Sequence, residues 1–330
     1  MSRLVQKLCI FFVAIGFTLE ARAAQNFSAI VAFGDSLSDL GNTFNDLGDS
    51  LSFFIIGYNS YYYDQGRWSD GPVWVEDLAR LFGVDALQRN DGSNLYGTDF
   101  AWGGATSGNG YTFVPPGFHL SNLQTQISTY ITLLTTKDAR MPDPAETLFT
   151  VWSGGNDVIY RIQEYFFYTP VPAQTIANNV GEAITSLYQA GGRYFLVPNL
   201  PPLGDKPNYR TNPKYGQEAN AFVMEYNPLL DAKMDQLQQT LAGVTIIQFD
   251  TYKLFNAVIA NKSAYKLTNV TDAAFSPDNS THGGSVVPNP DQYLFWDTTH
   301  PTRVGHEIVA ESIYDMIQKT LAAALSDSNG

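Results

Sequence analysis

Ser36 stands where a short apolar stretch stops, and such a position suits a nucleophile. Residues 28–33 are apolar and partly β-branched, which predicts a buried strand. A serine at the rigid end of a strand can present its hydroxyl to a cleft, and the N–H groups of a following helix would stabilise negative charge there. Gly34-Asp35-Ser36 is equally an ordinary turn sequence, so the hypothesis needs a base, an orienting acid and an oxyanion hole elsewhere in the chain.

Asp297 and His300 are the candidates for acid and base. They are three residues apart, after the strand-like run 293–296 and before Pro301, which suits the start of a helix. On one tight turn the carboxylate would accept from Nδ1–H of His300 and leave Nε2 free to take a proton from Ser36. A capping Asp beside a surface His is the other interpretation. Of the four histidines in the chain, this one alone has an acid at this spacing together with these flanking elements.

Two glycine-rich loops could provide the oxyanion hole. A short strand is predicted between residues 94 and 102, ahead of Gly103 and Gly104. Glycines let backbone N–H groups approach a ligand closely, and no Gly-Lys-Ser/Thr follows to indicate a phosphate-binding loop. The apolar run 147–152 predicts another buried strand, and the polar tip that carries Asn156 follows it directly.

The elements that must position these residues alternate along the chain. Strands are predicted at 28–33, 147–152, 193–197 and 244–249, and helices at 72–81, 120–134, 175–188, 217–241, 251–260 and 302–325. Pro228 would kink or break the helix predicted at 217–241. This alternation predicts an α/β fold with a parallel sheet covered on both faces, in which ligands bind at the carboxyl ends of the strands. One cleft would then collect Ser36, Gly104 and Asn156.

The first residues predict export. Arg3 and Lys7 precede an apolar run from 8 to 19, and small residues end at Ala23, which together indicate a secretory signal peptide over residues 1–23. The alternative, a membrane anchor, would need a longer apolar run, and no later run is long enough either. Cleavage would leave 24–330 as a single secreted domain and would remove Cys9, the only cysteine. The mature chain would therefore rely on its core and not on disulfides.

The charge of the chain limits its partners. Its 330 residues carry a net charge of −13, and loss of the signal peptide would make this −15. A chain this acidic is a poor binder of nucleic acid and is weakly repelled by anionic membranes, so neutral or zwitterionic substrates fit better. No feature of the sequence indicates the oligomeric state.

Two further stretches have open roles. Aromatic residues at 43–66 and 165–168 are either packing groups or the wall of an acyl-chain site. Residues 261–292 are polar and predict a long, weakly structured loop that could act as a lid. Four glycosylation sequons begin at Asn26, Asn261, Asn269 and Asn279.

Five short segments resemble the conserved blocks of the GDSL, or SGNH, hydrolases. Four occur in the order of that family's blocks and span most of the mature chain, and the fifth resembles a stretch of its secreted, lipolytic branch. The four are 33–39 (FGDSLSD), 103–105 (GGA), 155–157 (GND) and 297–301 (DTTHP), and the fifth is 66–74 (GRWSDGPVW). Each segment alone is a weak signal, and the set together is a strong one.

The resemblance implies a role for each matched residue. Ser36 matches the nucleophile, His300 the general base and Asp297 its orienting partner. The backbone N–H groups of Ser36 and Gly104 and the side-chain amide of Asn156 match the oxyanion hole; Gly103 is the other candidate for the glycine donor. The resemblance further implies a flavodoxin-like, three-layer α/β/α domain and chemistry that needs no metal ion or organic cofactor.

The function that these observations predict is a secreted serine ester hydrolase that works through an acyl-enzyme. The resemblance and the aromatic stretches favour acyl lipids such as lysophospholipids as substrates. The alternatives are a carbohydrate acetylesterase, an acyltransferase that uses an alcohol in place of water, and a catalytically silent binding protein on the same fold.

Overall fold

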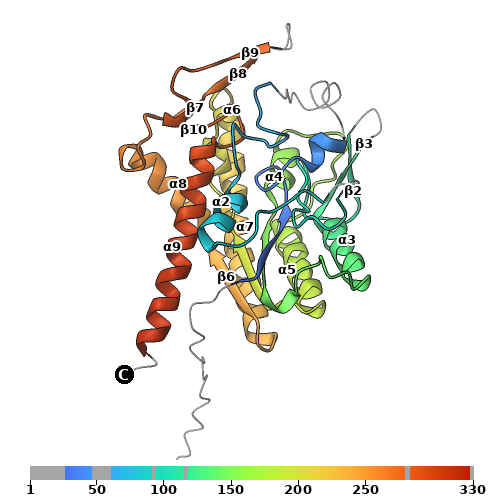
Figure 1. Ribbon diagram of the computed structural model, residues 1–330. Coiled ribbons are helices and arrows are strands. Elements are labelled where there is room, and N and C mark those ends of the chain that lie inside the picture. The colour runs from blue at the N-terminus through green and yellow to red at the C-terminus, as the bar shows by residue number, and fades with distance from the viewer. Residues whose placement is uncertain (1–26, 47–60, 91–93, 115–117, 279–282, 328–330) are drawn as a thin grey trace, which may run out of the picture.

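The computed structural model describes residues 27–46, 61–90, 94–114, 118–278 and 283–327 (Figure 1). The predicted signal peptide, Cys9, the sequons at Asn26 and Asn279, and most of the aromatic stretch 43–66 lie outside these residues. Within them, no helix combines the length and the apolar character needed to cross a bilayer.

Four parallel strands form the central sheet, in the spatial order β1-β4-β5-β6. Their bounds are Ala29–Gly34 for β1, Thr147–Trp152 for β4, Tyr194–Pro198 for β5 and Thr245–Phe249 for β6. Val31, Phe149, Phe195 and Ile246 lie side by side across the sheet. The four strands expected from the apolar runs are therefore confirmed to within one residue at each end.

The segment before the glycine cluster runs beside β1 without forming a regular strand. Ala32 N–H donates to the Thr98 carbonyl at 2.8 Å, and Phe100 N–H donates back to the Ala32 carbonyl at 2.8 Å. The pairing amounts to an isolated parallel bridge, because the chain soon turns away into the glycines. The prediction of a short strand between residues 94 and 102 is therefore wrong, because only a single bridge to β1 forms. If this segment is numbered as the second of five along the chain, the spatial order across the sheet is 2-1-3-4-5. This is a flavodoxin-like order, in which the crevice lies at the carboxyl ends of β1 and β4.

Helices cover both faces of the sheet, as predicted. Alternate residues of β1 face opposite sides, with Val31 and Phe33 in one core and Ile30 and Ala32 in the other. The first core is covered by α3 (Leu123–Thr135), α5 (Ala173–Gln189) and α7 (Pro213–Thr240), and the second by α2 (Trp74–Phe82), α8 (Thr251–Ala260) and α9 (Arg303–Asp327). In Figure 1, α9 lies on one side of the sheet and α3 and α5 on the other. The fold is the expected three-layer α/β/α sandwich.

The six predicted helices all form, with ends shifted by a few residues. The largest shift is in α7, which begins four residues earlier than predicted and continues through Pro228. The predicted break is therefore wrong. Proline removes the hydrogen bond to the carbonyl four residues earlier, here that of Met224, but buried residues on both sides of it, such as Val223 and Leu230, pack in the first core and hold the helix together.

Several short elements escape the sequence patterns because they are too short to show a period. They are α4 (Gly155–Ile162), α6 (Pro207–Arg210), the antiparallel pair β2 (Tyr111–Val114) and β3 (Phe118–Ser121), and single 3₁₀ turns at 144–146, 203–205 (η2), 262–265 and 290–292. Of these, α4 and the η2–α6 segment matter most, since both border the candidate site.

Residues 261–292 are not the weakly structured loop that their polarity predicts. They contain β7 (Asn269–Ala273), which pairs with β10 (Tyr293–Phe295), and β8 (Phe275–Asp278), which pairs with β9 (Gly283–Val286). The physical reason is an aromatic cluster, in which Phe275 stacks on Trp296 at 5.5 Å and on Tyr62 at 4.5 Å between ring centroids. None of the described residues of this segment lines the cavity described below, so a lid finds no support.

Candidate active site

Ser36 lies in a tight turn directly after β1. Gly34 permits this close packing, because a Cβ there would meet the Trp152 carbonyl oxygen of β4 at 2.3 Å. Asp35 holds the turn with its carboxylate, which accepts from the N–H of Leu37 at 3.0 Å. Burial raises the pKa of the Asp35 carboxyl to about 6. The next helix along the chain begins only at residue 42. The helix N-terminus that would have stabilised negative charge at Ser36 is therefore not present there.

His300 reaches Ser36 across 264 positions of sequence. Its Nε2 lies 2.9 Å from Ser36 Oγ, and its Nδ1 lies 2.8 Å from Asp297 Oδ2. The side chains of the three residues are buried. A hydroxyl, an imidazole and a carboxylate linked in this way can activate the hydroxyl as a nucleophile, with the carboxylate fixing the imidazole tautomer.

Asp297 has a partner for each of its oxygens. Oδ1 accepts from the N–H groups of Thr299 and His300, both at 2.7 Å, and Oδ2 accepts from Tyr63 at 2.7 Å as well as from His300. Burial alone would raise the pKa of this carboxyl, but the charge and hydrogen bonds of His300 and the Tyr63 hydroxyl outweigh it, so the pKa is lowered. The carboxylate is thus held ionised and oriented.

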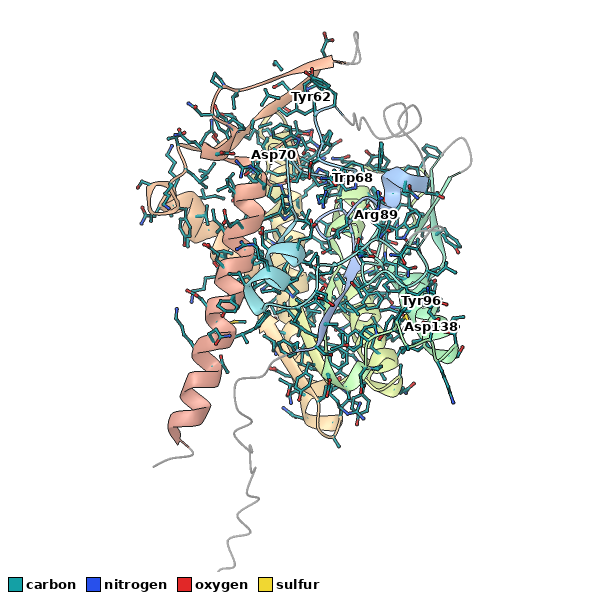
Figure 2. All side chains as sticks on the ribbon, in the orientation of Figure 1. Tyr62, Trp68, Asp70, Arg89, Tyr96 and Asp138 are labelled. Carbon is teal, nitrogen blue, oxygen red and sulfur yellow. The ribbon has the colours of Figure 1, made fainter. Side chains whose placement is uncertain are left out.

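The segment around Trp68 supports the imidazole from the side. The ring of Trp68, which is labelled in Figure 2, lies 5.1 Å from the His300 ring between centroids, and its indole N–H donates to Asp39. Arg67 forms a two-bond ion pair with Glu76, and Asp70 accepts from the N–H of Arg303. Arg67 and Asp70 therefore have structural roles. The contacts of Tyr63 and Trp68 with the site could not be predicted from their positions in the sequence.

The structure distinguishes between the two glycines of the second loop. The N–H of Gly103 is already bound, to Asp39 at 2.9 Å and Thr43 at 2.7 Å. Gly104 has φ +79°, and among the described residues its N–H has no hydrogen-bond acceptor. A Cβ at Gly104 would lie 2.8 Å from the Tyr160 hydroxyl, which donates to the Gly104 carbonyl at 2.9 Å. Gly104 is therefore the glycine whose N–H can serve a ligand.

Asn156 is placed by the first turn of α4, which starts three residues after β4 ends. Its side-chain nitrogen donates to the Ala105 carbonyl at 3.0 Å, which ties it to the glycine loop and leaves one amide hydrogen for a ligand. Asn156, Gly104 and Ser36 all line one cavity. The structure thus brings together all five residues that the sequence singled out, with Asp297 one layer behind His300.

Buried carboxylates that the sequence analysis missed hold these loops in place. Asp39 accepts from backbone N–H groups of its own turn and from Gly103, while Asp157 accepts from the N–H and hydroxyl of Ser107 and from Tyr168. Burial raises the pKa of both carboxyls, that of Asp157 to about 6. Both lie inside matched segments, Asp39 in 33–39 and Asp157 in 155–157, which was the available signal.

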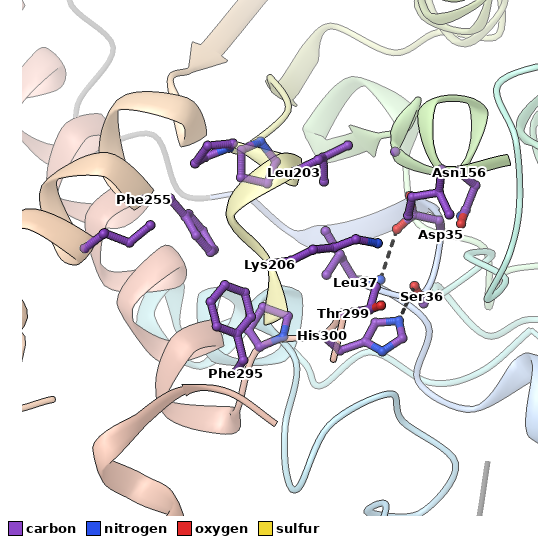
Figure 3. Close-up of a pocket in the computed structure, with 16 residues that line it drawn as sticks. Asp35, Ser36, Leu37, Asn156, Leu203, Lys206, Phe255, Phe295, Thr299 and His300 are labelled. Carbon is purple, nitrogen blue, oxygen red and sulfur yellow. Dashed lines mark hydrogen bonds between the residues drawn. The ribbon is translucent and has the colours of Figure 1, made fainter. Parts of the chain in front are cut away.

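The cavity has two lobes that meet at Ser36. The smaller lobe, about 60 Å³, is mainly apolar (Figure 3), and the larger, about 340 Å³, is more polar. The smaller is called the inner lobe and the larger the outer lobe. Apolar groups of the inner lobe include Leu37, Pro202, Leu203, Phe255, Ile259 and Phe295. Tyr165 and Phe167 line the outer lobe. By contrast, Tyr62 and Tyr63 pack against Phe275, so the described part of the stretch 43–66 does not form the acyl-site wall that its composition suggested.

The chain matches a known family over most of its length. The GDSL-like Lipase/Acylhydrolase family description matches residues 30–313. The chain therefore belongs to this family of carboxylic ester hydrolases.

Particular relatives share a little over a quarter of their residues with the chain. The thermolabile hemolysin of Vibrio parahaemolyticus is 28% identical over 87% of this chain, which spans 63% of the hemolysin's length. Acetylajmalan esterase 2 of Rauvolfia serpentina is 28% identical over 94% of this chain and 95% of its own length. Among solved structures, an aryl esterase of M. smegmatis aligns with a TM-score of 0.47 and 14% identity, over 88% of this chain and 99% of its own.

Proposed function

We propose that the protein is a serine ester hydrolase in which Ser36 is the nucleophile, His300 the general base and Asp297 the residue that orients His300. The observation that carries this proposal is the hydrogen-bonded series from Ser36 Oγ through the imidazole to the carboxylate, with distances of 2.9 and 2.8 Å. Such a series at the end of β1, facing a cavity, is the arrangement that acyl transfer to a serine requires.

The reaction proceeds in two halves. Ser36 Oγ bonds to the ester carbonyl carbon as His300 Nε2 takes its proton, and the oxyanion is held by the N–H groups of Ser36 and Gly104 and the Asn156 amide. The bond to the alcohol oxygen then breaks, and His300 gives its proton to that oxygen. In the second half, water adds to the acyl-enzyme and passes a proton to His300. Ser36 then leaves with that proton, and the carboxylic acid is released.

Acyl lipids such as lysophospholipids are the substrate class we propose. The apolar inner lobe can take an acyl chain, and the larger outer lobe can take the alcohol part. The Vibrio relative is by its name a hemolysin, and we take this as support for a substrate from cell membranes. We also infer that residues 1–23 direct export, so that residues 24–330 act as one secreted domain outside the cytoplasm.

A short-chain esterase is the second candidate. The inner lobe, about 60 Å³, is small for a long acyl chain, and the Rauvolfia relative is by its name an acetylesterase. An acetylated carbohydrate would place its sugar in the outer lobe, where Tyr165 and Phe167 could stack on it. An alcohol that binds there could also accept the acyl group in place of water.

Two measurements test the proposal. Fluorophosphonate labelling is expected to disappear in Ser36→Ala and to persist in Ser128→Ala, a change at an exposed serine of α3. Labelling that survives in Ser36→Ala would refute the nucleophile. Rates on p-nitrophenyl esters from acetyl to dodecanoyl, beside lysophosphatidylcholine and acetylated xylan, then separate the substrates. A strict preference for acetyl would overturn the lipid proposal and leave the esterase proposal standing.

A further inference from the structure

Lys206 is a buried cation at the junction of the two lobes. It lies between η2 and α6, is 3% exposed, and lines both the inner and the outer lobe together with Ser36 and His300. Figure 3 draws its side chain reaching toward the side of the cavity where Asp35, Ser36 and Asn156 lie. An ester bound at Ser36 and the ammonium of Lys206 must therefore lie in the same cavity.

The ammonium of Lys206 has no anionic partner of its own. Among the described residues, nothing accepts a hydrogen bond from it or forms an ion pair with it, and its Nζ lies 4.5 Å from the centroid of the Tyr209 ring. Burial lowers the pKa of Lys206 to about 7, and the charge of Asp297 opposes this only in part. Asp297 is in any case fully engaged by His300, Tyr63 and Thr299.

The position of this charge is unusual within this chain. The protein is strongly acidic, and no other lysine or arginine is found among the described residues that line either lobe. The Asp35 carboxyl lines the same inner lobe, but among the described residues no hydrogen bond or ion pair joins it to Lys206. A buried ammonium without an ion-pair partner destabilises the fold, so a packing role would be served better by an apolar side chain of similar length. An anionic ligand that enters the cavity would supply the missing counter-charge.

We propose that Lys206 binds a phosphate group in the alcohol part of the substrate, as in the phosphodiester of a lysophospholipid, and so determines substrate specificity. The inference deepens the proposed function and rests on it. Lysine binds phosphate as a point charge, and the apolar inner lobe beside it leaves the anion to the outer lobe. Asn208 stands at the outer lobe as a further amide that can donate to phosphate oxygens.

The first test compares two substrates that differ only in the phosphocholine group. Octanoyl lysophosphatidylcholine and monooctanoylglycerol, both below their aggregation concentrations, are given to the wild type, to Lys206→Met and to Lys214→Met, which removes an exposed lysine from α7. Lys206→Met is expected to lower kcat/KM on the phospholipid by tenfold or more and to change kcat/KM on the glycerol ester by less than threefold. Lys214→Met should leave both unchanged. Equal losses on both substrates in Lys206→Met would show a purely structural role and overturn the proposal.

The second test does not depend on lipid turnover. Binding of sn-glycero-3-phosphocholine, inorganic phosphate and, as a neutral control, glycerol is followed by ligand NMR line broadening with wild type and with Lys206→Met. Glycerophosphocholine is expected to bind the wild type and to lose at least tenfold in affinity in the variant, whereas glycerol should not distinguish them. Equal affinity of both proteins for glycerophosphocholine, or no binding to the wild type, would overturn the inference.

Together the two tests separate the possible failures. Turnover of p-nitrophenyl esters without turnover of either octanoyl lipid would refute the lipid substrate. Lys206-dependent binding of glycerophosphocholine would then still support a phosphate site. If inorganic phosphate alone binds through Lys206, the site recognises free phosphate and not a headgroup, and the specificity proposal fails.

Discussion

Tyr63 and His300 donate to the same oxygen of Asp297, at 2.7 and 2.8 Å respectively. The carboxylate is therefore held from two sides, by a tyrosine some 230 positions away and by a histidine three residues away. Tyr63 itself packs edge-on against Trp68 and Trp296. The position of the imidazole thus depends on an aromatic cluster as well as on the turn that carries it.

Asp297→Asn is expected to lower kcat by roughly 10⁴-fold, since an amide favours the wrong imidazole tautomer. Tyr63→Phe should lower kcat about tenfold, because it removes one of several hydrogen bonds to a charged group. The matched control is Tyr62→Phe, whose hydroxyl donates to the Gly284 carbonyl and not to the site. Steady-state kinetics with a p-nitrophenyl ester measure all three, and equal rates for the two tyrosine variants would contradict the role of Tyr63.

Asn156→Ala should cost about 3 kcal/mol of transition-state stabilisation, or a fall in kcat of roughly a hundredfold or more, with KM little changed. The reason is the loss of a donor to the oxyanion, whose charge develops only in the transition state. Asn256→Ala, at an exposed asparagine of α8, is the control for loss of an amide elsewhere. A rise in KM at constant kcat would show that Asn156 binds the ground state instead.

Lys206→Met is expected to stabilise the fold. The pKa of Lys206 is lowered to about 7 by burial, so the unfolded chain takes up a proton at higher pH than the folded chain does. Stability is therefore lost as pH falls from about 10.5 toward 7, and the variant should gain on the order of 4 kcal/mol at pH 7 and about 1 kcal/mol at pH 9.5. Urea unfolding at the two pH values measures this. An equal gain at both would show that packing, and not charge, causes it.

His306 predicts a loss of stability in acid. It is 1% exposed in α9, and burial lowers its pKa to about 3, with the charge of His300 acting in the same direction. The unfolded chain binds this proton near pH 6.5, so stability falls below that pH, by about 3 kcal/mol at pH 4.5. His306→Leu should remove this part of the loss.

The His306 test must compare the unfolding free energies of variant and wild type, because Asp35 and Asp157 change stability with pH in the opposite direction. Their pKa values of about 6 mean that the folded chain protonates them first, which adds stability as pH falls from 6 toward 4. The unfolding free energy of His306→Leu minus that of the wild type should rise between pH 8 and pH 4.5. A gap that stays constant would show that His306 is not neutral and buried in solution.

The amino-acid sequence by itself determined the layers and the ends of the sheet. Apolar runs such as 147–152 predict buried strands because a parallel sheet hides both faces, and alternation with amphipathic helices leaves few other topologies. Ser36 and Asn156 each follow such a run, and Gly104 follows the segment 94–102 that was predicted as a short strand, so their meeting at one edge was predictable from chain order.

Only the tertiary structure decided which groups contact one another within that edge. It shows that Gly103 is bound by Asp39 and that Tyr63 reaches Asp297, and it gives 261–292 strands where polarity predicted a loop. It also buries Lys206. From the sequence alone, a single lysine in a polar stretch is expected to lie at the surface. The reason is that periodicity reports how a segment faces its core, whereas these contacts depend on how segments far apart in sequence pack together.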